Sequence, residues 1–318
     1  MIKETKQPLV ILTGPTAVGK TTLSIQLAKQ IGGEIISADS MQVYRRMDIG
    51  SAKILPEEMQ GVPHHLINIL NPEDSFNVVL FQQLVKDCLK GIYERGHIPI
   101  LTGGTGFYIQ AVLYDIDFTE NEENAFYRHE LEKIAREKGN TFLHDMLREV
   151  DEASAEAIHE NNVKRVIRAL EFYMLTGKRI SEHNDAEREK EPAYQACYFV
   201  LNDNREALYD RIDERVEHMI QNGLVEEVKE LKASGCTKDM VSMQGLGYKE
   251  ILSYLEGEIS LERAVYLVKR DTRHFAKRQL TWFRRERDVI WVQKNEFLYD
   301  NARILDYMLQ KINEIIQK

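Results

Sequence analysis

Short apolar runs alternate with helical patterns along the first part of the chain. The apolar runs lie at 8–13, 33–38 and 98–101, while the intervening segments 20–31 and 81–96 carry apolar residues at helical spacing. This alternation is typical of βαβ units, in which a helix connects two parallel strands. The pattern predicts an α/β fold whose mostly parallel sheet is flanked by helices.

The pattern changes from about residue 117 to 190, where the sequence becomes charged and poor in strand residues. Segments 128–139, 142–150 and 162–178 carry apolar residues at helical spacing. Asn161 or Asn162 is expected to cap the last of these helices, and Gly177 to end it. We therefore expect a catalytic core formed by 1–116 and 191–318, interrupted by a helical insertion at 117–190.

The last part of the chain returns to a mixed pattern. Apolar runs at 194–201 and 289–292 predict two more strands, and helical patterns occupy 206–223, 224–235, 248–257, about 260–287 and the C-terminal segment. With 318 residues and 43% hydrophobic content, the chain can bury a sizeable core. No apolar stretch approaches the length of a membrane span, so a cytoplasmic location is expected. The three widely spaced cysteines indicate neither a disulfide framework nor a zinc site.

A glycine-rich loop lies between the first apolar run and the first helical pattern. Residues 14–21, GPTAVGKT, fill the G-x-x-x-x-G-K-[ST] template in the strand-loop-helix context that it requires. Such a loop binds phosphate through backbone N–H groups, a lysine charge and a hydroxyl that can hold Mg²⁺. The candidate phosphate-binding residues are Gly14, Thr16, Ala17, Val18, Gly19, Lys20 and Thr21, with Thr21 as the metal ligand. The core is thus expected to be P-loop NTPase-like, although such loops serve several reaction classes.

Two further candidates follow the next predicted strands, because open α/β sheets bind ligands beyond the carboxyl ends of their strands. Asp39 follows the second strand and could accept a proton or bind an acceptor hydroxyl or amine; a helix N-cap is the structural alternative. The turn at 102–108, TGGTGFY, stands where many ATP-hydrolysing enzymes have a magnesium-binding Asp. It indicates further backbone amides and a Thr hydroxyl near the same phosphates, or else a simple strand-to-helix turn.

Positive charge gathers near the end of this acidic chain, whose net charge is −9. Residues 263–288 hold nine Lys or Arg against three Asp or Glu, a net charge of +6. Arg270, Arg273 and Lys277 share one helical face, and the few acidic neighbours favour phosphate contacts over a solvated charged face. An apolar face, expected to pack inward, contains Val265, Val268, Ala276, Leu280 and Phe283.

Two smaller features keep structural interpretations open. Arg165 and Arg168 form a second basic patch in the insertion, where ion pairs with neighbouring glutamates explain the spacing equally well. His64 and His65 are adjacent, so on a strand they point to opposite faces and cannot easily share a ligand. We interpret both histidines as structural.

Several separated motifs together resemble those of bacterial tRNA dimethylallyltransferases, also called tRNA isopentenyltransferases. They lie at 14–21, 36–53, 62–66, 103–108, 165–171, 245–250 and 277–284, and so span nearly the whole chain. The sequences ADSMQVY and GGTGFY are the most specific. The resemblance implies transfer of a dimethylallyl group from dimethylallyl diphosphate to N6 of the adenosine 3′ to the anticodon in tRNA, with release of diphosphate.

The resemblance also implies roles for individual residues. Asp39 would accept the proton of the attacking amine, Lys20 and Arg215 would bind the diphosphate, Thr105 would lie beside the transferred group, and Mg²⁺ would be the cofactor. The residues expected to contact the tRNA anticodon stem-loop are Asp39, Ser40, Met41, Gln42, Thr105, Arg128, Lys164, Arg165, Arg168, Arg273 and Lys277. The insertion would grasp the tRNA, and the enzyme is expected to act as a monomer without membrane attachment.

Three rival functions remain to be weighed. A small-molecule P-loop kinase would need ATP turnover but no basic helix. An adenylate isopentenyltransferase would share the chemistry but take a free nucleotide, for which the insertion and the basic stretch are hard to justify. An RNA-binding protein with a decayed P-loop is disfavoured by the intact Lys20, Thr21 and Asp39.

Overall fold

The computed structural model describes residues 6–118 and 125–316 and consists of two compact units. One unit, the core unit, comprises Met1–Leu113 and Ala193–Lys318, and the other, the helical unit, comprises Tyr114–Pro192. The helical unit thus begins three residues before the insertion expected from the sequence and ends two residues after it.

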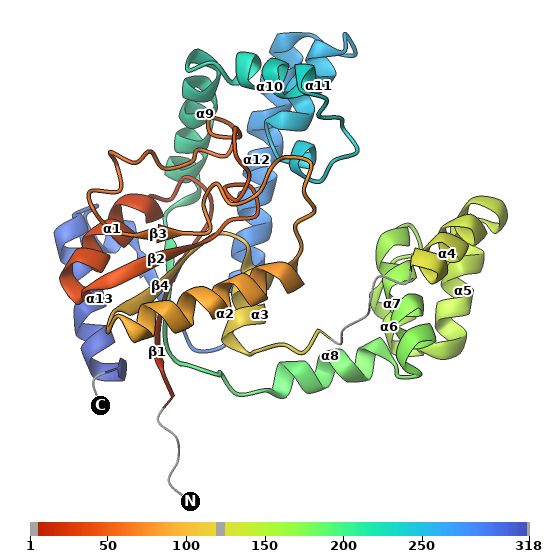
Figure 1. The fold of residues 1–318 in the computed structure, drawn as a ribbon, viewed down its shortest axis with the longest axis horizontal. Helices are drawn as coiled ribbons and strands as arrows, with labels where there is room; N and C mark the ends of the chain where they lie inside the picture. Colours follow the sequence, from red (N-terminus) through yellow and green to blue (C-terminus); the bar gives the residue numbers. More distant parts are fainter. Residues whose placement is uncertain (1–5, 119–124, 317–318) are drawn as a thin grey trace, which may run out of the picture. The chain divides into compact units, whose positions relative to one another are not determined.

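A six-stranded sheet in the order β3-β2-β4-β1-β5-β6 organises the core unit, and every neighbouring pair is parallel (Figure 1). Its strands are β1 Pro8–Thr13, β2 Gly33–Ala38, β3 His64–His65, β4 Ile98–Gly103, β5 Gln195–Asn202 and β6 Val289–Gln293. The predicted α/β class and parallel sheet are confirmed. The two-residue strand β3 was not expected, because two residues carry no readable period.

Helices cover the sheet. Because all its strands are parallel, their carboxyl ends lie along one edge. The core unit contains α1 Lys20–Ile31, α2 Val78–Glu94, α3 Gly106–Leu113, α9 Arg205–Gln221, α10 Leu224–Ala233, α11 Tyr248–Leu255, α12 Leu261–Phe283 and α13 Asn301–Ile316, with 3₁₀ turns at Ser242–Gln244 and Lys294–Phe297. Val10 and Leu12 of β1 pack in one cluster with residues of α1 and α13. Their neighbours Leu9 and Ile11 are equally buried, so both faces of β1 are covered, as parallel sheets require.

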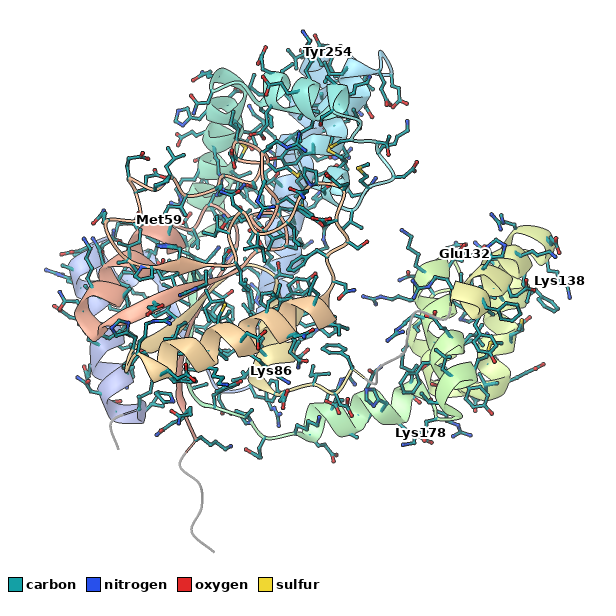
Figure 2. The ribbon with its side chains drawn as sticks, viewed as in Figure 1. Met59, Lys86, Glu132, Lys138, Lys178 and Tyr254 are labelled. Carbon is teal, nitrogen blue, oxygen red and sulfur yellow. The ribbon has the colours of Figure 1, made fainter. Side chains whose placement is uncertain are left out.

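The helical unit has a hydrophobic core of its own. It contains α4 Ala125–Lys138, α5 Asn140–Val150, α6 Glu152–Ala157, α7 Val163–Thr176 and α8 Ile180–Glu189, and no strand within its described residues. Leu131, Leu143 and Leu147 pack against Val166 and Leu170 of α7. Charged side chains project from the surface of these helices (Figure 2).

The ends of α7 follow the sequence expectation in part. Gly177 ends the helix in the left-handed conformation, with φ 68°, which glycine adopts without steric cost. Asn162 occupies the N-cap position but makes no side-chain cap hydrogen bond. Of the helices in 6–118 and 125–316, none is long and apolar enough to cross a membrane.

Candidate active site

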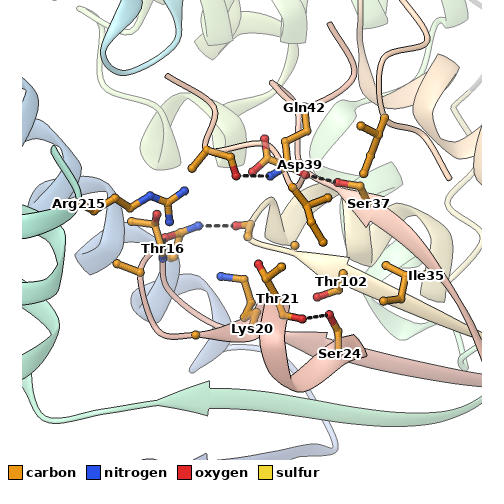
Figure 3. A pocket seen from close by; sticks show the side chains of 18 of the residues that line it. Thr16, Lys20, Thr21, Ser24, Ile35, Ser37, Asp39, Gln42, Thr102 and Arg215 are labelled. Carbon is orange, nitrogen blue, oxygen red and sulfur yellow. Dashed lines mark hydrogen bonds between the residues drawn. The ribbon is translucent and has the colours of Figure 1, made fainter. Parts of the chain in front are cut away.

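A pocket of about 380 Å³ lies at the carboxyl ends of β1, β2 and β4, where the sequence placed the candidate residues (Figure 3). Eight of those candidates line it: Thr16, Ala17, Gly19, Lys20, Thr21, Asp39, Gln42 and Arg215. The pocket therefore unites the phosphate loop with a carboxylate and a guanidinium that are distant in sequence.

The phosphate loop is held in a backbone conformation that other loops rarely adopt. Gly14 has φ +145°, and a Cβ atom there would lie 2.2 Å from the carbonyl oxygen of Leu201, so only glycine fits. Ala17 has φ 62°, an uncommon value for a residue with a side chain. Val18 is fully buried in the hydrophobic core, so only its backbone could face a ligand. Between Gly14 and Gly19 the loop can therefore present main-chain groups to the pocket, and the side chains of Lys20 and Thr21 follow at the start of α1.

Lys20 at the start of α1 is the central cation of the pocket. Its Nζ donates hydrogen bonds to the carbonyl oxygens of Gly14 and Pro15, at 2.9 and 2.8 Å. Burial and, to a smaller extent, the nearby charge of Arg215 lower the pKa of Lys20 to about 7, although the charge of Asp39 acts in the opposite direction. An anionic ligand beside Lys20 would therefore meet a cation that is poorly solvated and ready to pair.

Helix α9 contributes four titratable side chains to the pocket lining, at positions i, i+3, i+4 and i+7: Arg211, Glu214, Arg215 and His218. Burial lowers the pKa of Arg215, while Asp39 acts in the opposite direction. The Nε of Arg211 donates to the carbonyl oxygen of Ala17 at 3.1 Å, and its Nη2 donates to Asp203 at 2.7 Å. The sequence analysis missed Arg211, Glu214 and His218, although the helical spacing of Arg211 and His218 from Arg215 could have indicated them.

Asp39 follows β2 and caps a turn rather than an α-helix. Its Oδ1 accepts a hydrogen bond from the backbone N–H of Met41 at 2.8 Å, which fixes the orientation of the carboxylate. Beside it, the hydroxyl of Ser37 donates to the side-chain oxygen of Gln42 at 3.1 Å (Figure 3). Ser40 and Met41 lie in the same turn but outside the pocket lining.

The turn after β4 reaches the pocket through its glycines. Gly103 and Gly104 line it, whereas Thr105 stands just outside the lining. The backbone N–H of Thr105 donates to the carbonyl oxygen of Ala38 at 3.3 Å, so the ends of β2 and β4 are joined. Gln279 of α12 also lines the pocket and was missed, because its helix was analysed for its charges.

Part of the pocket lining, called the apolar wall below, consists of apolar side chains, which the sequence analysis did not foresee. Its residues are Ile35, Ala52, Ile54, Ile67 and Phe275. These residues come from a strand, an irregular segment and a distant helix, so no local period connects them. The pocket can therefore bind a ligand that contains both an anionic group and an apolar group.

The two adjacent histidines have different surroundings, as their strand position predicted. His64 lines the pocket, its Nδ1 lies 2.8 Å from the carbonyl oxygen of Val62, and burial lowers its pKa. His65 instead contacts Glu34 through Nε2 at 2.6 Å. In the part of the chain that the structure describes, no cluster of three or more His, Cys, Asp or Glu could hold a metal ion.

The basic stretch on α12 has few acidic residues of its own, as its sequence shows, but it finds acidic partners on another helix. Arg273 pairs with Asp213 and Lys269 with Glu217, both on α9, while Arg270 pairs with the adjacent Asp271. The sequence count missed these partners because two of them lie on another helix. Lys277 is exposed, whereas Arg273 is half-buried.

The cations expected to contact tRNA in the helical unit divide into two kinds. Arg128 and Arg168 both approach the buried carboxylate of Glu171, at 2.9 and 3.5 Å. Lys164 and Arg165 are exposed on α7. The ion-pair alternative left open by the sequence therefore holds for Arg168.

Comparison with known proteins decides the family. A family model described as IPP transferase matches residues 42–286, from the turn after Asp39 into the last residues of the basic stretch. The chain belongs to the IPP transferase family. It is therefore a prenyltransferase, and the pocket is the natural candidate for its active site.

Similar members of the IPP transferase family include two bacterial proteins named tRNA dimethylallyltransferase. The protein of Lachnoclostridium phytofermentans is 61% identical over 97% of this chain and 98% of its own length, and that of Carboxydothermus hydrogenoformans is 53% identical over 90% and 91%. Among solved structures, the full-length tRNA isopentenylpyrophosphate transferase of Bacillus halodurans is 44% identical, with a TM-score of 0.73 over 98% of this chain and 99% of its own. A eukaryotic dimethylallyltransferase acting on tRNA is 29% identical, with a TM-score of 0.78 over 90% and 74%.

Proposed function

We propose that this IPP transferase family member transfers the dimethylallyl group of dimethylallyl diphosphate to N6 of the adenosine 3′-adjacent to the anticodon in tRNA, releasing diphosphate. One observation carries the proposal: a single pocket joins a phosphate loop, the Asp39 carboxylate and an apolar wall. These parts match a diphosphate, an attacking amine and a short hydrocarbon chain. The names of the similar enzymes support the same substrates.

The phosphate loop would stabilise the leaving group. As the carbon–oxygen bond breaks, negative charge grows on the departing diphosphate, and fixed donors aimed at that charge lower the barrier. The amides of the loop, the Lys20 ammonium and the Arg215 guanidinium converge on the same pocket. Diphosphate would replace the Gly14 and Pro15 carbonyls as the partner of Lys20.

Mg²⁺ fits the start of α1, where the Thr21 hydroxyl lines the pocket. Magnesium prefers oxygen ligands and is commonly bound by few protein groups together with phosphates and water. Since no cluster of three acidic, His or Cys side chains lies in the described residues, diphosphate oxygens and water would complete its coordination. When bound, the ion would neutralise charge on the departing diphosphate.

Asp39 would accept the proton that the adenosine amine loses as its nitrogen bonds to the allyl carbon. The hydrogen bond from Met41 leaves the carboxylate in a fixed orientation at the pocket wall. The base must leave the stack of the anticodon loop to reach this position, at a cost that is smaller in single-stranded RNA. Gln42, which also lines the pocket, would contact such a base.

Exposed cations would hold the RNA outside the pocket. Lys277 on α12 and the Lys164–Arg165 pair on α7 carry charges that can bind phosphates. The proposal includes action as a monomer in the cytoplasm, and light scattering of the purified protein would test the first of these two points.

Incubation of the purified protein with unmodified tRNA, Mg²⁺ and either dimethylallyl diphosphate or ATP tests the proposed reaction. Mass analysis of the digested nucleosides should detect a dimethylallyl gain on adenosine with the first donor only. Prenylation of added AMP without modification of tRNA would indicate an enzyme acting on free nucleotides. Transfer of phosphate from ATP to a small molecule would indicate a kinase.

A further inference from the structure

Gln279 connects the two loops that close the pocket. It lies on α12, is 6% exposed, and uses both ends of its side-chain amide. Its Oε1 accepts a hydrogen bond from the backbone N–H of Thr16 at 2.9 Å, and its Nε2 donates to the carbonyl oxygen of Gly104 at 2.9 Å. One side chain thus bonds to the phosphate loop after β1 and to the turn after β4.

The space for this bridge depends on glycine at position 104. A Cβ atom on Gly104 would lie 2.1 Å from Nε2 of Gln279, whereas its next neighbours would be 3.4 Å away or more. The backbone at this position therefore approaches the amide more closely than any other residue type would permit. An alanine at position 104 would therefore clash with one atom of Gln279, and this clash can be removed by changing Gln279 alone.

We propose that Gln279 is a positioning residue for the diphosphate site. By bonding to Thr16 and Gly104, it fixes the distance between the two loops, so that the main-chain donors of the phosphate loop are set before a ligand arrives. Preorganised donors bind developing charge without reorganisation at the moment of reaction. Gln279 would act through these loops rather than by touching the reacting atoms, and this inference rests on the proposed function.

The bridge also makes α12 part of the diphosphate site. Lys277, expected to bind RNA, precedes Gln279 by two residues in the same helix. A displacement of α12 would therefore move Gln279, the hydrogen-bond partner of both Thr16 and Gly104.

Two variants distinguish the effect of losing the hydrogen bonds from the effect of losing packing contacts. Gln279→Met keeps most of the side-chain volume but removes both hydrogen bonds. The double variant Gly104→Ala/Gln279→Ala removes the steric conflict and the hydrogen bonds together, while the alanine methyl group fills part of the space. Gln83→Met, at an exposed position of α2, is the control.

The main measurement is the dissociation constant of inorganic pyrophosphate with Mg²⁺, by calorimetry in the absence of tRNA. Steady-state kcat and KM for dimethylallyl diphosphate and thermal unfolding accompany it. Gln279→Met and the double variant should each weaken pyrophosphate binding roughly tenfold, the effect of about one neutral hydrogen bond, and should raise KM. The control should bind as the parent does.

Parental pyrophosphate affinity in folded Gln279→Met, or in the double variant, would overturn the proposal and leave Gln279 a packing residue. The double variant decides the matter if Gln279→Met fails to fold. Because the binding assay contains no tRNA, it remains decisive even if the parent modifies no tRNA. In that case the proposed function fails, while the positioning role is judged by pyrophosphate binding alone.

Discussion

The pocket of the core unit and the surface of the helical unit use positive charge in opposite ways. In the pocket, Lys20 and Arg215 are half-buried, and burial lowers the pKa of both. On the helical unit, Lys164 and Arg165 project into solvent from α7. Buried cations interact strongly over short distances, whereas exposed ones act through a field that salt screens.

The two regions should therefore contribute to different steps of the reaction. A pocket of oriented, desolvated groups can stabilise charge that appears at one atom, so changes there should lower kcat or donor affinity. Exposed cations bind the regular charges of an RNA backbone, so changes there should alter RNA affinity and its salt dependence. Substitutions in each region test whether this division holds.

The largest effect is expected from Asp39→Asn. The amide keeps an oxygen that can accept from Met41 N–H, but it cannot take the proton of the amine. Loss of a general base lowers kcat by about 10² to 10⁴-fold, with tRNA binding unchanged. Single-turnover modification and anticodon stem-loop binding would be measured side by side, with Asp87→Asn on the exposed surface of α2 as the control. Near-parental turnover would assign proton acceptance to another group.

The pH dependence of diphosphate binding should single out Lys20. Its pKa is lowered to about 7, so above that pH the free enzyme loses the ammonium proton. A bound diphosphate favours the charged form, so binding takes up a proton, and affinity should fall as pH rises above 7, by up to about tenfold per pH unit. Calorimetric titrations of pyrophosphate between pH 6 and 9, values chosen to bracket the pKa, would measure this slope.

Lys20→Arg is the control for that titration, because arginine stays charged throughout this range. Ionisation of pyrophosphate itself contributes equally to both proteins, so the difference between the two slopes isolates Lys20. Identical slopes would mean that Lys20 keeps its proton and that its burial does not govern binding.

The apolar wall should set the length of the transferred chain. Ile54, which is 8% exposed, lines the pocket beside Ile35 and Ile67. Ile54→Ala removes three methyl or methylene groups, so kcat/KM for dimethylallyl diphosphate should fall about tenfold while that for geranyl diphosphate rises. Competition assays with the two donors would measure the ratio. Leu55→Ala, at the exposed neighbouring position, should leave it unchanged, and an unchanged ratio in Ile54→Ala would place the chain elsewhere.

How much the sequence predicts depends on whether a contact follows a local period. Short-range patterns predict the phosphate loop, the position of Asp39 at a strand end, and every strand of the parallel sheet except β3. The apolar wall and the Gln279 bridge do not, because their residues meet only after distant segments fold together. The acidic partners of α12 were missed for the same reason: Asp213 lies sixty positions from Arg273 in the chain.

The smallest effect, and the sharpest contrast within the helical unit, is expected between Arg165→Ala and Arg168→Ala. Arg165 is exposed, whereas Arg168 shares the buried carboxylate of Glu171 with Arg128. An exposed cation that contacts a phosphate releases about one counterion, so Arg165→Ala should reduce the slope of log K against log salt concentration by about 0.7 to 0.9. Arg168→Ala should change it less, because part of that charge is already neutralised. Fluorescence anisotropy with a labelled anticodon stem-loop would measure both slopes, and equal slopes for Arg165→Ala and the parent would remove Arg165 from the RNA contact.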